Sequence, residues 1–130
     1  MALRFPANLR YTKDHEWVRS ESDGQFTIGI TDFAQRELSD IVFVELPSVD
    51  DTFAEGDEFG TVEAVKTVSS LYMPLAGTVV AINTDLNDDP SVVNNDPYEA
   101  GWMIRISAEN EAEWENLLKV DAYQSAIDTD

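Results

Sequence analysis

The sequence predicts a mainly β protein, a small barrel or sandwich with a C-terminal helix packed on it. Short runs rich in β-branched and aromatic residues recur at close spacing between Glu16 and Ile106, separated by Gly, Pro, Asn and Asp. Beyond Ile106, apolar residues recur mostly every three or four positions, which is typical of an amphipathic helix. A length of 130 residues fits one domain. We expect a single domain over 1–130, with a β core at about 11–107 and a helical region at about 108–128.

The first half contains three predicted strands and one short helix. The strands are predicted at Glu16–Arg19, Gln25–Ile30 and Ile41–Leu46, the last ended by Pro47. Thr31 is a plausible N-cap, and good helix formers follow it up to Leu38. The helix predicted there has room for about two turns.

The second half continues the β pattern and then turns helical. The further strands are predicted at Glu58–Val65, Thr67–Tyr72, Thr78–Ile82 and Trp102–Ile106. The acidic stretch 83–97 is rich in turn residues, with one short helical turn around Ser91–Val93. The apolar periodicity of the tail is interrupted near Val120, so we expect the C-terminal helix to be broken there.

Lys66 is isolated within the run VEAVKTVSS, at or beside the tip of the predicted hairpin. Tight hairpin turns favour Asn-Gly or Asp-Gly because their backbone needs positive φ, and this run has neither. A lysine at a hairpin tip offers a flexible stem and an amine, suited to acylation by a long prosthetic group. The alternative is an ordinary exposed lysine that discourages pairing between sheet edges.

The composition excludes several classes of function. A net charge of −18 repels phosphate backbones and anionic bilayers, so we expect neither nucleic acid nor a membrane as partner. A basic docking site on another protein fits better, although the charge could serve solubility alone. The absence of cysteine excludes disulfides, thiolate metal sites and cysteine nucleophiles. No apolar stretch resembles a signal peptide or a membrane span, so a cytoplasmic protein is expected.

Two further features of the sequence could indicate a chemical function, but each also has a simpler structural explanation. His15 is the only histidine, so a small acidic hydrolase using His15 and a carboxylate is conceivable, although a surface or capping role fits better. The alternation of Asp85, Asn87 and Asp89 resembles a calcium-binding loop. Pro90 stands where that loop needs glycine, so a solvated turn is expected and no metal site.

Five blocks of the sequence closely resemble the H protein of the glycine cleavage system. They are YTKDHEWVR (Tyr11–Arg19), IGITDFAQREL (Ile28–Leu38), VFVELP (Val42–Pro47), FGTVEAVKTVSSLYMPLAGTVVAIN (Phe59–Asn83) and NNDPYEAGWMIRI (Asn94–Ile106). The resemblance implies a lipoyl/biotinyl-type flattened β-barrel, or barrel-sandwich hybrid, with a short helix in its N-terminal half and a C-terminal helix.

The resemblance also implies a cofactor. Lipoic acid would be attached to Lys66 through an amide, with Gly56 ten residues before that lysine and Gly77 eleven after it as the structural glycines of the motif. It further implies that the lipoylating enzyme recognises residues beside the lysine: Glu63, Val65 and Thr67. Biotin carriers usually place methionine on both sides of their lysine, so biotin is disfavoured.

By this resemblance the chain is a non-catalytic carrier. It would take an aminomethyl group from glycine decarboxylase (P protein) to aminomethyltransferase (T protein), and then reducing equivalents to dihydrolipoyl dehydrogenase (L protein). Lipoate-attaching enzymes are further implied partners, and a monomer is expected. The alternative is a lipoyl domain, or a lipoyl-relay protein, that serves 2-oxoacid dehydrogenases.

The family also shelters its arm in a surface cleft. Asp14, Glu16, Phe33 and Ser70 match positions near that cleft. Phe33 stands where many members have histidine or tyrosine, and Ser70 replaces a common aspartate. The details of arm sheltering are therefore expected to differ in this chain.

Overall fold

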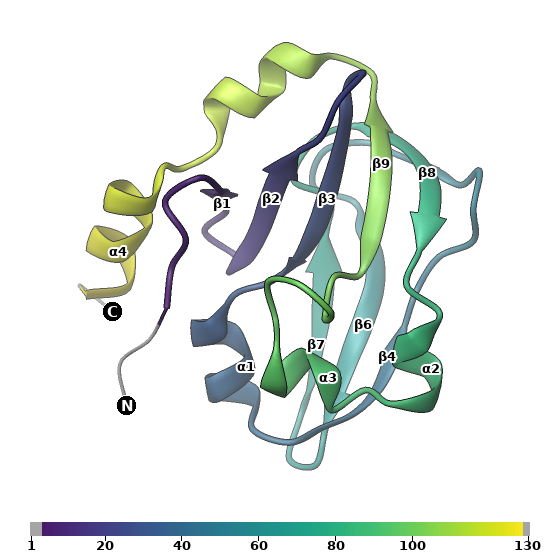
Figure 1. The fold of residues 1–130 in the computed structure, drawn as a ribbon, viewed down its shortest axis with the longest axis vertical. Helices are drawn as coiled ribbons and strands as arrows, with labels where there is room; N and C mark the ends of the chain where they lie inside the picture. The colour runs from purple at the N-terminus through teal and green to yellow at the C-terminus, as the bar shows by residue number, and fades with distance from the viewer. Residues whose placement is uncertain (1–3, 129–130) are drawn as a thin grey trace.

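A computed structural model describes residues 4–128 as two antiparallel sheets with helices at their ends (Figure 1). The six-stranded sheet has the order β1-β2-β3-β9-β8-β5 and the three-stranded sheet the order β4-β6-β7, so the predicted mainly β architecture is confirmed. The strands are β1 (Arg10–Tyr11), β2 (Glu16–Ser20), β3 (Gln25–Ile30), β4 (Ile41–Glu45), β5 (Thr52–Phe53), β6 (Glu58–Ala64), β7 (Val68–Tyr72), β8 (Gly77–Ile82) and β9 (Ile104–Ala108).

The main hydrophobic core joins residues of both sheets. Alternate residues of a strand point to opposite faces, and the inward ones are apolar: Ile28 of β3, Val62 of β6 and Ile106 of β9 are fully buried. A second cluster surrounds the stacked rings of Tyr11 and Tyr123. It fixes the C-terminal helix against the short strand β1.

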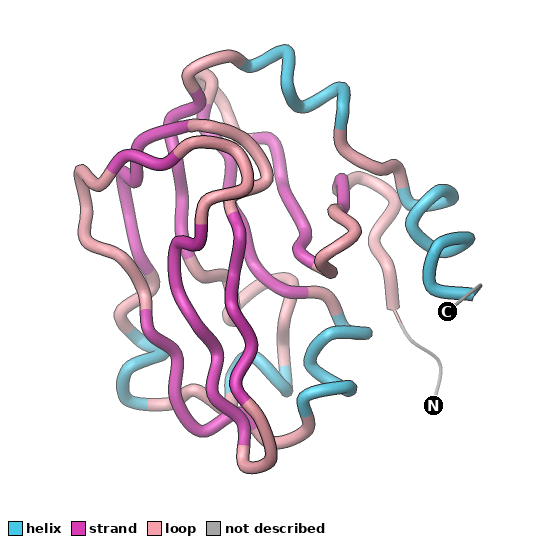
Figure 2. The backbone as a smooth tube through the Cα atoms, turned by 180° about the vertical axis from the view of Figure 1, so that it is seen from behind, coloured by secondary structure: helices cyan, strands magenta, loops and turns pink. Residues whose placement is uncertain are grey.

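The turn of the β6–β7 hairpin lies at the lower end of the molecule (Figures 1 and 2). Glu63 pairs with Val68, and the Ala64 N–H donates to the Thr67 carbonyl over 2.8 Å to close the turn. Lys66 is exposed within this turn. The predicted hairpin, with the lysine at its tip, is confirmed.

The helices follow their local signals. In α1 (Asp32–Leu38), the Thr31 hydroxyl accepts from the Ala34 N–H, as predicted for an N-cap. The tail forms a 3-10 helix at Glu111–Asn116, an extended segment in which Leu118 bridges to Tyr11, and then α4 (Val120–Asp128). The predicted interruption near Val120 is confirmed. No helix within 4–128 is long and apolar enough to cross a membrane.

Three details differ from the sequence predictions. The two-residue strands β1 and β5 were not predicted, because two residues cannot show a periodicity. The stretch 83–97 contains two short helices, α2 (Asp85–Asp88) and α3 (Val92–Asn95), where one helical turn was predicted. Leu86 and Val93 anchor them in the core, which overrides the poor helix propensity of their Asp and Asn neighbours. The last strand begins at Ile104, not at Trp102.

Candidate functional site

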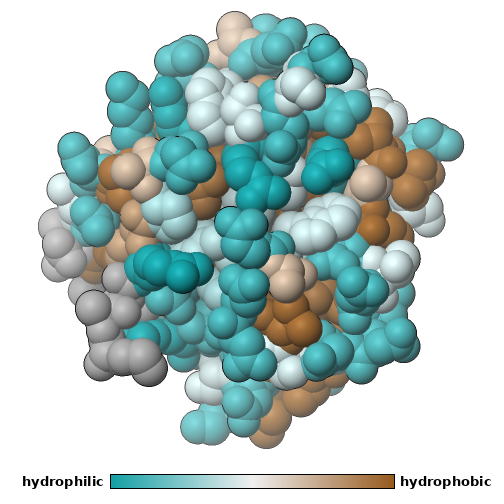
Figure 3. Space-filling model, viewed as in Figure 1, coloured by the Kyte–Doolittle hydropathy of each residue, from teal (hydrophilic) through white to brown (hydrophobic). Residues whose placement is uncertain are grey.

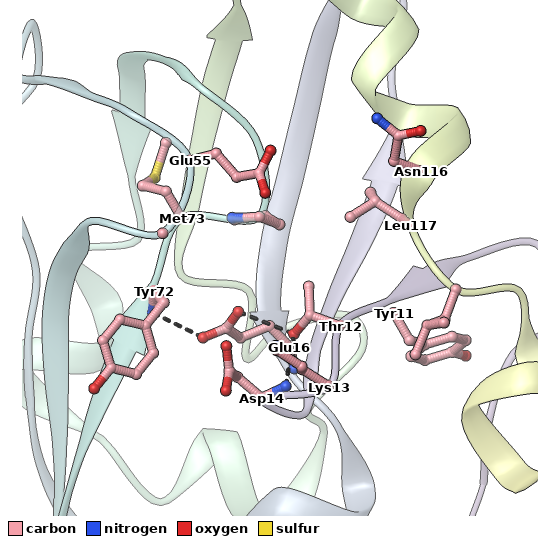
Figure 4. Close-up of a pocket in the computed structure, with 13 residues that line it drawn as sticks. Tyr11, Thr12, Lys13, Asp14, Glu16, Glu55, Tyr72, Met73, Asn116 and Leu117 are labelled. Atoms are coloured by element: carbon pink, nitrogen blue, oxygen red, sulfur yellow. Dashed lines mark hydrogen bonds between the residues drawn. The ribbon is translucent and has the colours of Figure 1, made fainter. Parts of the chain in front are cut away.

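A surface cleft of about 400 Å³ lies where the turn before β2, the end of β7 and the C-terminal segment meet (Figure 4). The cleft is lined by Tyr11, Thr12, Lys13, Asp14, Glu16, Glu55, Gly56, Tyr72, Met73, Pro74, Asn116, Leu117 and Leu118. These residues come from four segments of the chain that are far apart in sequence.

Glu16 is the buried carboxyl group of this cleft, with only 1% of its surface exposed. Its two oxygens accept hydrogen bonds from the Thr12 hydroxyl over 3.1 Å and from the Tyr72 N–H over 2.8 Å. Burial raises the pKa of Glu16 to about 8, although both hydrogen bonds act in the opposite direction. The negative charge of Asp14 adds to the rise. A group with this pKa can hold or release a proton near neutral pH.

A tight turn between β1 and β2 sets the position of Glu16. The Thr12 hydroxyl accepts from the N–H groups of Asp14 and Glu16, each over 3.2 Å, and His15 adopts a left-handed φ of 70°. The turn leaves Asp14 exposed at the rim while Glu16 points inward. Two predicted cleft residues, Asp14 and Glu16, are therefore brought together.

The other two predicted cleft residues lie elsewhere. Phe33 belongs to α1, and its ring packs against the His15 ring at 4.7 Å between centroids. Ser70 lies on β7 opposite Thr61 and is half-buried. Neither residue is among the described residues that line the cleft.

His15 belongs to an aromatic cluster that joins the β1–β2 turn to the C-terminal helix. Its Nδ1 lies 2.8 Å from the Tyr123 hydroxyl, which also lies 2.8 Å from the Thr31 hydroxyl. Burial raises the pKa of Tyr123 to about 12. This packing role differs from the surface or capping role predicted for His15, and it gives the hydrolase hypothesis no support.

The second group of predicted site residues lies around the hairpin tip. Lys66, Glu63, Val65 and Thr67 are all exposed, and 70% of the Val65 surface is accessible. They form an accessible surface around the lysine amine. The arrangement leaves the amine open to acylation by another protein.

Glycine is required at the two predicted structural positions for different physical reasons. Gly56 has a φ of +88°, a conformation that side chains rarely adopt, and open space where a Cβ would stand. At Gly77 an added Cβ would lie 2.6 Å from the Ser107 carbonyl oxygen of β9. One glycine is needed for backbone conformation and the other for the close approach of two strands.

Comparison with known proteins decides the family. A sequence profile described as glycine cleavage H-protein matches residues 9–130. The chain belongs to the glycine cleavage H-protein family. The glycine cleavage system H protein of Idiomarina loihiensis is 53% identical over 125 residues, covering 96% of this chain and 97% of that protein. That of Listeria innocua is 49% identical, covering 97% of this chain and all of that protein.

A solved member of the H-protein family confirms the fold. The crystal structure of a glycine cleavage system H protein from Mycobacterium marinum superposes with a TM-score of 0.87 at 37% identity, over 95% of this chain and 99% of the other. The lipoyl-type barrel-sandwich fold expected from the sequence is therefore correct. Within residues 4–128, the two sheets are separate and do not close into a continuous barrel.

Sequence reasoning missed the residues that hold Glu16 and close the cleft. Thr12 and Tyr72 bind the Glu16 carboxyl group, and Met73 and Leu117 supply apolar walls. A threonine four residues before a glutamate was the only local signal, and it is common. Tyr72 acts through its backbone, which no side-chain pattern reveals.

Proposed function

We propose that the chain is the lipoyl carrier of a glycine cleavage system, with lipoate attached through an amide to the Nζ atom of Lys66. The observation that carries the proposal is the exposed lysine at the tip of the β6–β7 hairpin in a member of this family. Lysine at this tip fits the group, because its amine is accessible and neighbouring side chains do not cover it. Lipoate supplies a dithiol–disulfide pair that takes up an aminomethyl group and reducing equivalents.

The rest of the chain acts by positioning and shielding. An exposed turn at the end of the molecule lets one attached group reach several enzymes in turn, and tethering replaces free diffusion with a high local concentration. Strand β7 leads from the tip to the cleft: Val68 and Tyr72 are about 13 Å apart along the strand. The partners proposed on this basis are the P, T and L proteins and the lipoate-attaching enzymes.

The cleft offers an acidic, partly apolar shelter at the far end of β7. Met73 and Leu117 exclude water on one side, while Asp14 and Glu16 present carboxyl groups on the other. A small cationic amine suits this lining, because the negative charge of Asp14 attracts it and its positive charge favours loss of the proton from Glu16. We assign this sheltering role to Asp14 and Glu16. We propose that Ser70 lies beside the path of the lipoyl arm along β7 but does not form the wall of the cleft.

The test is intact-mass analysis of the chain after incubation with a lipoate–protein ligase, ATP and lipoate. A single lipoyl adduct is expected on the wild-type chain and none on Lys66→Arg, while Lys13→Arg and Lys119→Arg keep the adduct. An adduct that persists in Lys66→Arg would refute the assignment of the attachment site.

A further inference from the structure

Four exposed apolar side chains surround the hairpin tip. Val42, Phe43, Val65 and Val68 expose 48%, 49%, 70% and 60% of their surfaces. Hydrophobic residues also reach the surface at the lower end of the molecule in Figure 3, where Figure 1 places the β6–β7 turn. We call Val42, Phe43, Val65 and Val68 the tip patch.

Strand pairing places two residues of the tip patch, Phe43 and Val68, on either side of Glu63. Phe43 pairs with Glu63, and Glu63 pairs with Val68, so these three residues form one row across the β4-β6-β7 sheet. Residues that lie directly opposite one another share a face of the sheet. The Val65 N–H donates to the Asp40 carbonyl over 3.1 Å, which brings the turn beside the start of β4.

A β-bulge exposes two apolar residues where a regular strand would expose one. The register of β4 against β6 shifts between Ile41 and Phe43, and the burial pattern is Ile41 in, Val42 out, Phe43 out, Val44 in. Strict alternation would have turned Val42 and Phe43 to opposite faces. Bulges of this kind redirect side chains next to functional sites. The tip patch is therefore built into the fold beside Lys66.

We propose that the tip patch docks the enzyme that attaches lipoate to Lys66, an inference that rests on the proposed function. The partner surface that fits it is a shallow apolar pocket with basic residues at its rim, because the exposed acids Asp40, Glu45 and Glu63 lie in or beside the patch. A second copy of this chain fits poorly, since it would bring the same acids together in a molecule of net charge −18.

The reach of the lysine selects this partner over the others. In the attachment step the Lys66 Nζ forms a C–N bond to the carbonyl carbon of a lipoyl–adenylate, the C–O bond to phosphate breaks, and AMP and a proton leave. The Nζ atom lies about 6 Å from its own Cα, so an enzyme acting on it must lie against the hairpin tip. The dithiolane of an extended lipoyl arm lies about 14 Å from that Cα, so enzymes acting on it need not cover the patch.

The test compares the unmodified chain with the double variant Val42→Thr/Phe43→Thr, which keeps β-favouring residues at exposed positions. Steady-state lipoylation by the ligase should show KM raised about tenfold, with kcat nearly unchanged. The Kd of the unmodified chain for the ligase, measured by calorimetry, should weaken by the same factor. Val65→Thr is a second test variant, because Val65 belongs to the tip patch but lies in the turn and not in a strand.

The matched controls are Val49→Thr and Val80→Thr. These valines expose 47% and 37% of their surfaces and lie outside the tip patch. Both control variants should be lipoylated like the wild type. Equal KM and Kd for the double variant and these controls would overturn the inference while leaving the lipoyl-carrier proposal intact. A wild-type chain that is not lipoylated would instead refute that proposal. A wild-type dimer dissociated by the double variant would assign the patch to self-association and also overturn the inference.

Discussion

Replacing Glu16 by glutamine should change how the stability of the protein depends on pH. Glu16 is almost completely buried, and burial raises its pKa from 4.5 to about 8. The folded protein therefore binds this proton more tightly than the unfolded chain does. Protonation stabilises the fold fully below about pH 4.5, and this contribution is lost as the pH rises through about 8.

The size of the effect follows from the pKa difference. Each pH unit between the two pKa values is worth about 1.4 kcal/mol, so the full loss is on the order of 5 kcal/mol. Between about pH 5.5 and 8, the free energy of unfolding of the wild type should fall by roughly 3 kcal/mol relative to Glu16→Gln. Glutamine has no charge to bury, so it does not share this loss. The variant should also lose about 1 kcal/mol at all pH values, because the amide has one acceptor oxygen for the two donors that bind the carboxyl group, Thr12 and Tyr72.

Urea unfolding followed by tryptophan fluorescence is a suitable assay, since Trp17 is buried. The measured quantity is the difference in unfolding free energy between the wild type and Glu16→Gln at several pH values. Glu45→Gln, which changes an exposed carboxyl group, is the matched control and should give a nearly constant difference. A difference for Glu16→Gln that is equally constant across this range would contradict the buried-carboxyl argument.

Four other predictions test the structure and its charges. Gly77→Ala should lower the free energy of unfolding by about 2–3 kcal/mol, because the added Cβ clashes with a β9 carbonyl. Gly56→Ala should lower it by about 1 kcal/mol through backbone strain alone. Both values can be measured by urea unfolding. Tyr123→Phe should cost about 1–3 kcal/mol in the same assay, because His15 and Thr31 lose its hydroxyl. Turnover with the P and T proteins should fall as salt rises, and an unchanged rate would refute electrostatic docking.

Much of the fold could be predicted because its signals are local. The β6–β7 hairpin follows from two β-favouring runs around Lys66, and the start of α1 follows from the Thr31 cap. The pairing of β9 with both β3 and β8 could not be predicted from periodicity, because it joins segments far apart in the chain. The same limit applies to β1, which is held by Leu118 from the C-terminal segment.

The candidate site also contains some residues whose role follows from local sequence and others whose role depends on distant segments. Lys66 stands out in the sequence because its neighbours do not explain it, and its exposure needs only the hairpin. The burial of Glu16 depends on β7 and on the turn at Thr12, so the sequence alone could not predict its raised pKa. The tip patch depends on a bulge in β4, which shifts the register without any glycine or proline to mark it.

The most direct test of the carrier role is the glycine-dependent exchange of labelled carbon dioxide by glycine decarboxylase. The enzyme is supplied with the lipoylated chain, the unmodified chain or Lys66→Arg after the same lipoylation treatment. Exchange should depend on the lipoylated chain and remain at background with the other two. Equal exchange with all three, or background exchange with a chain whose lipoyl adduct is verified by mass, would contradict the role proposed for this protein.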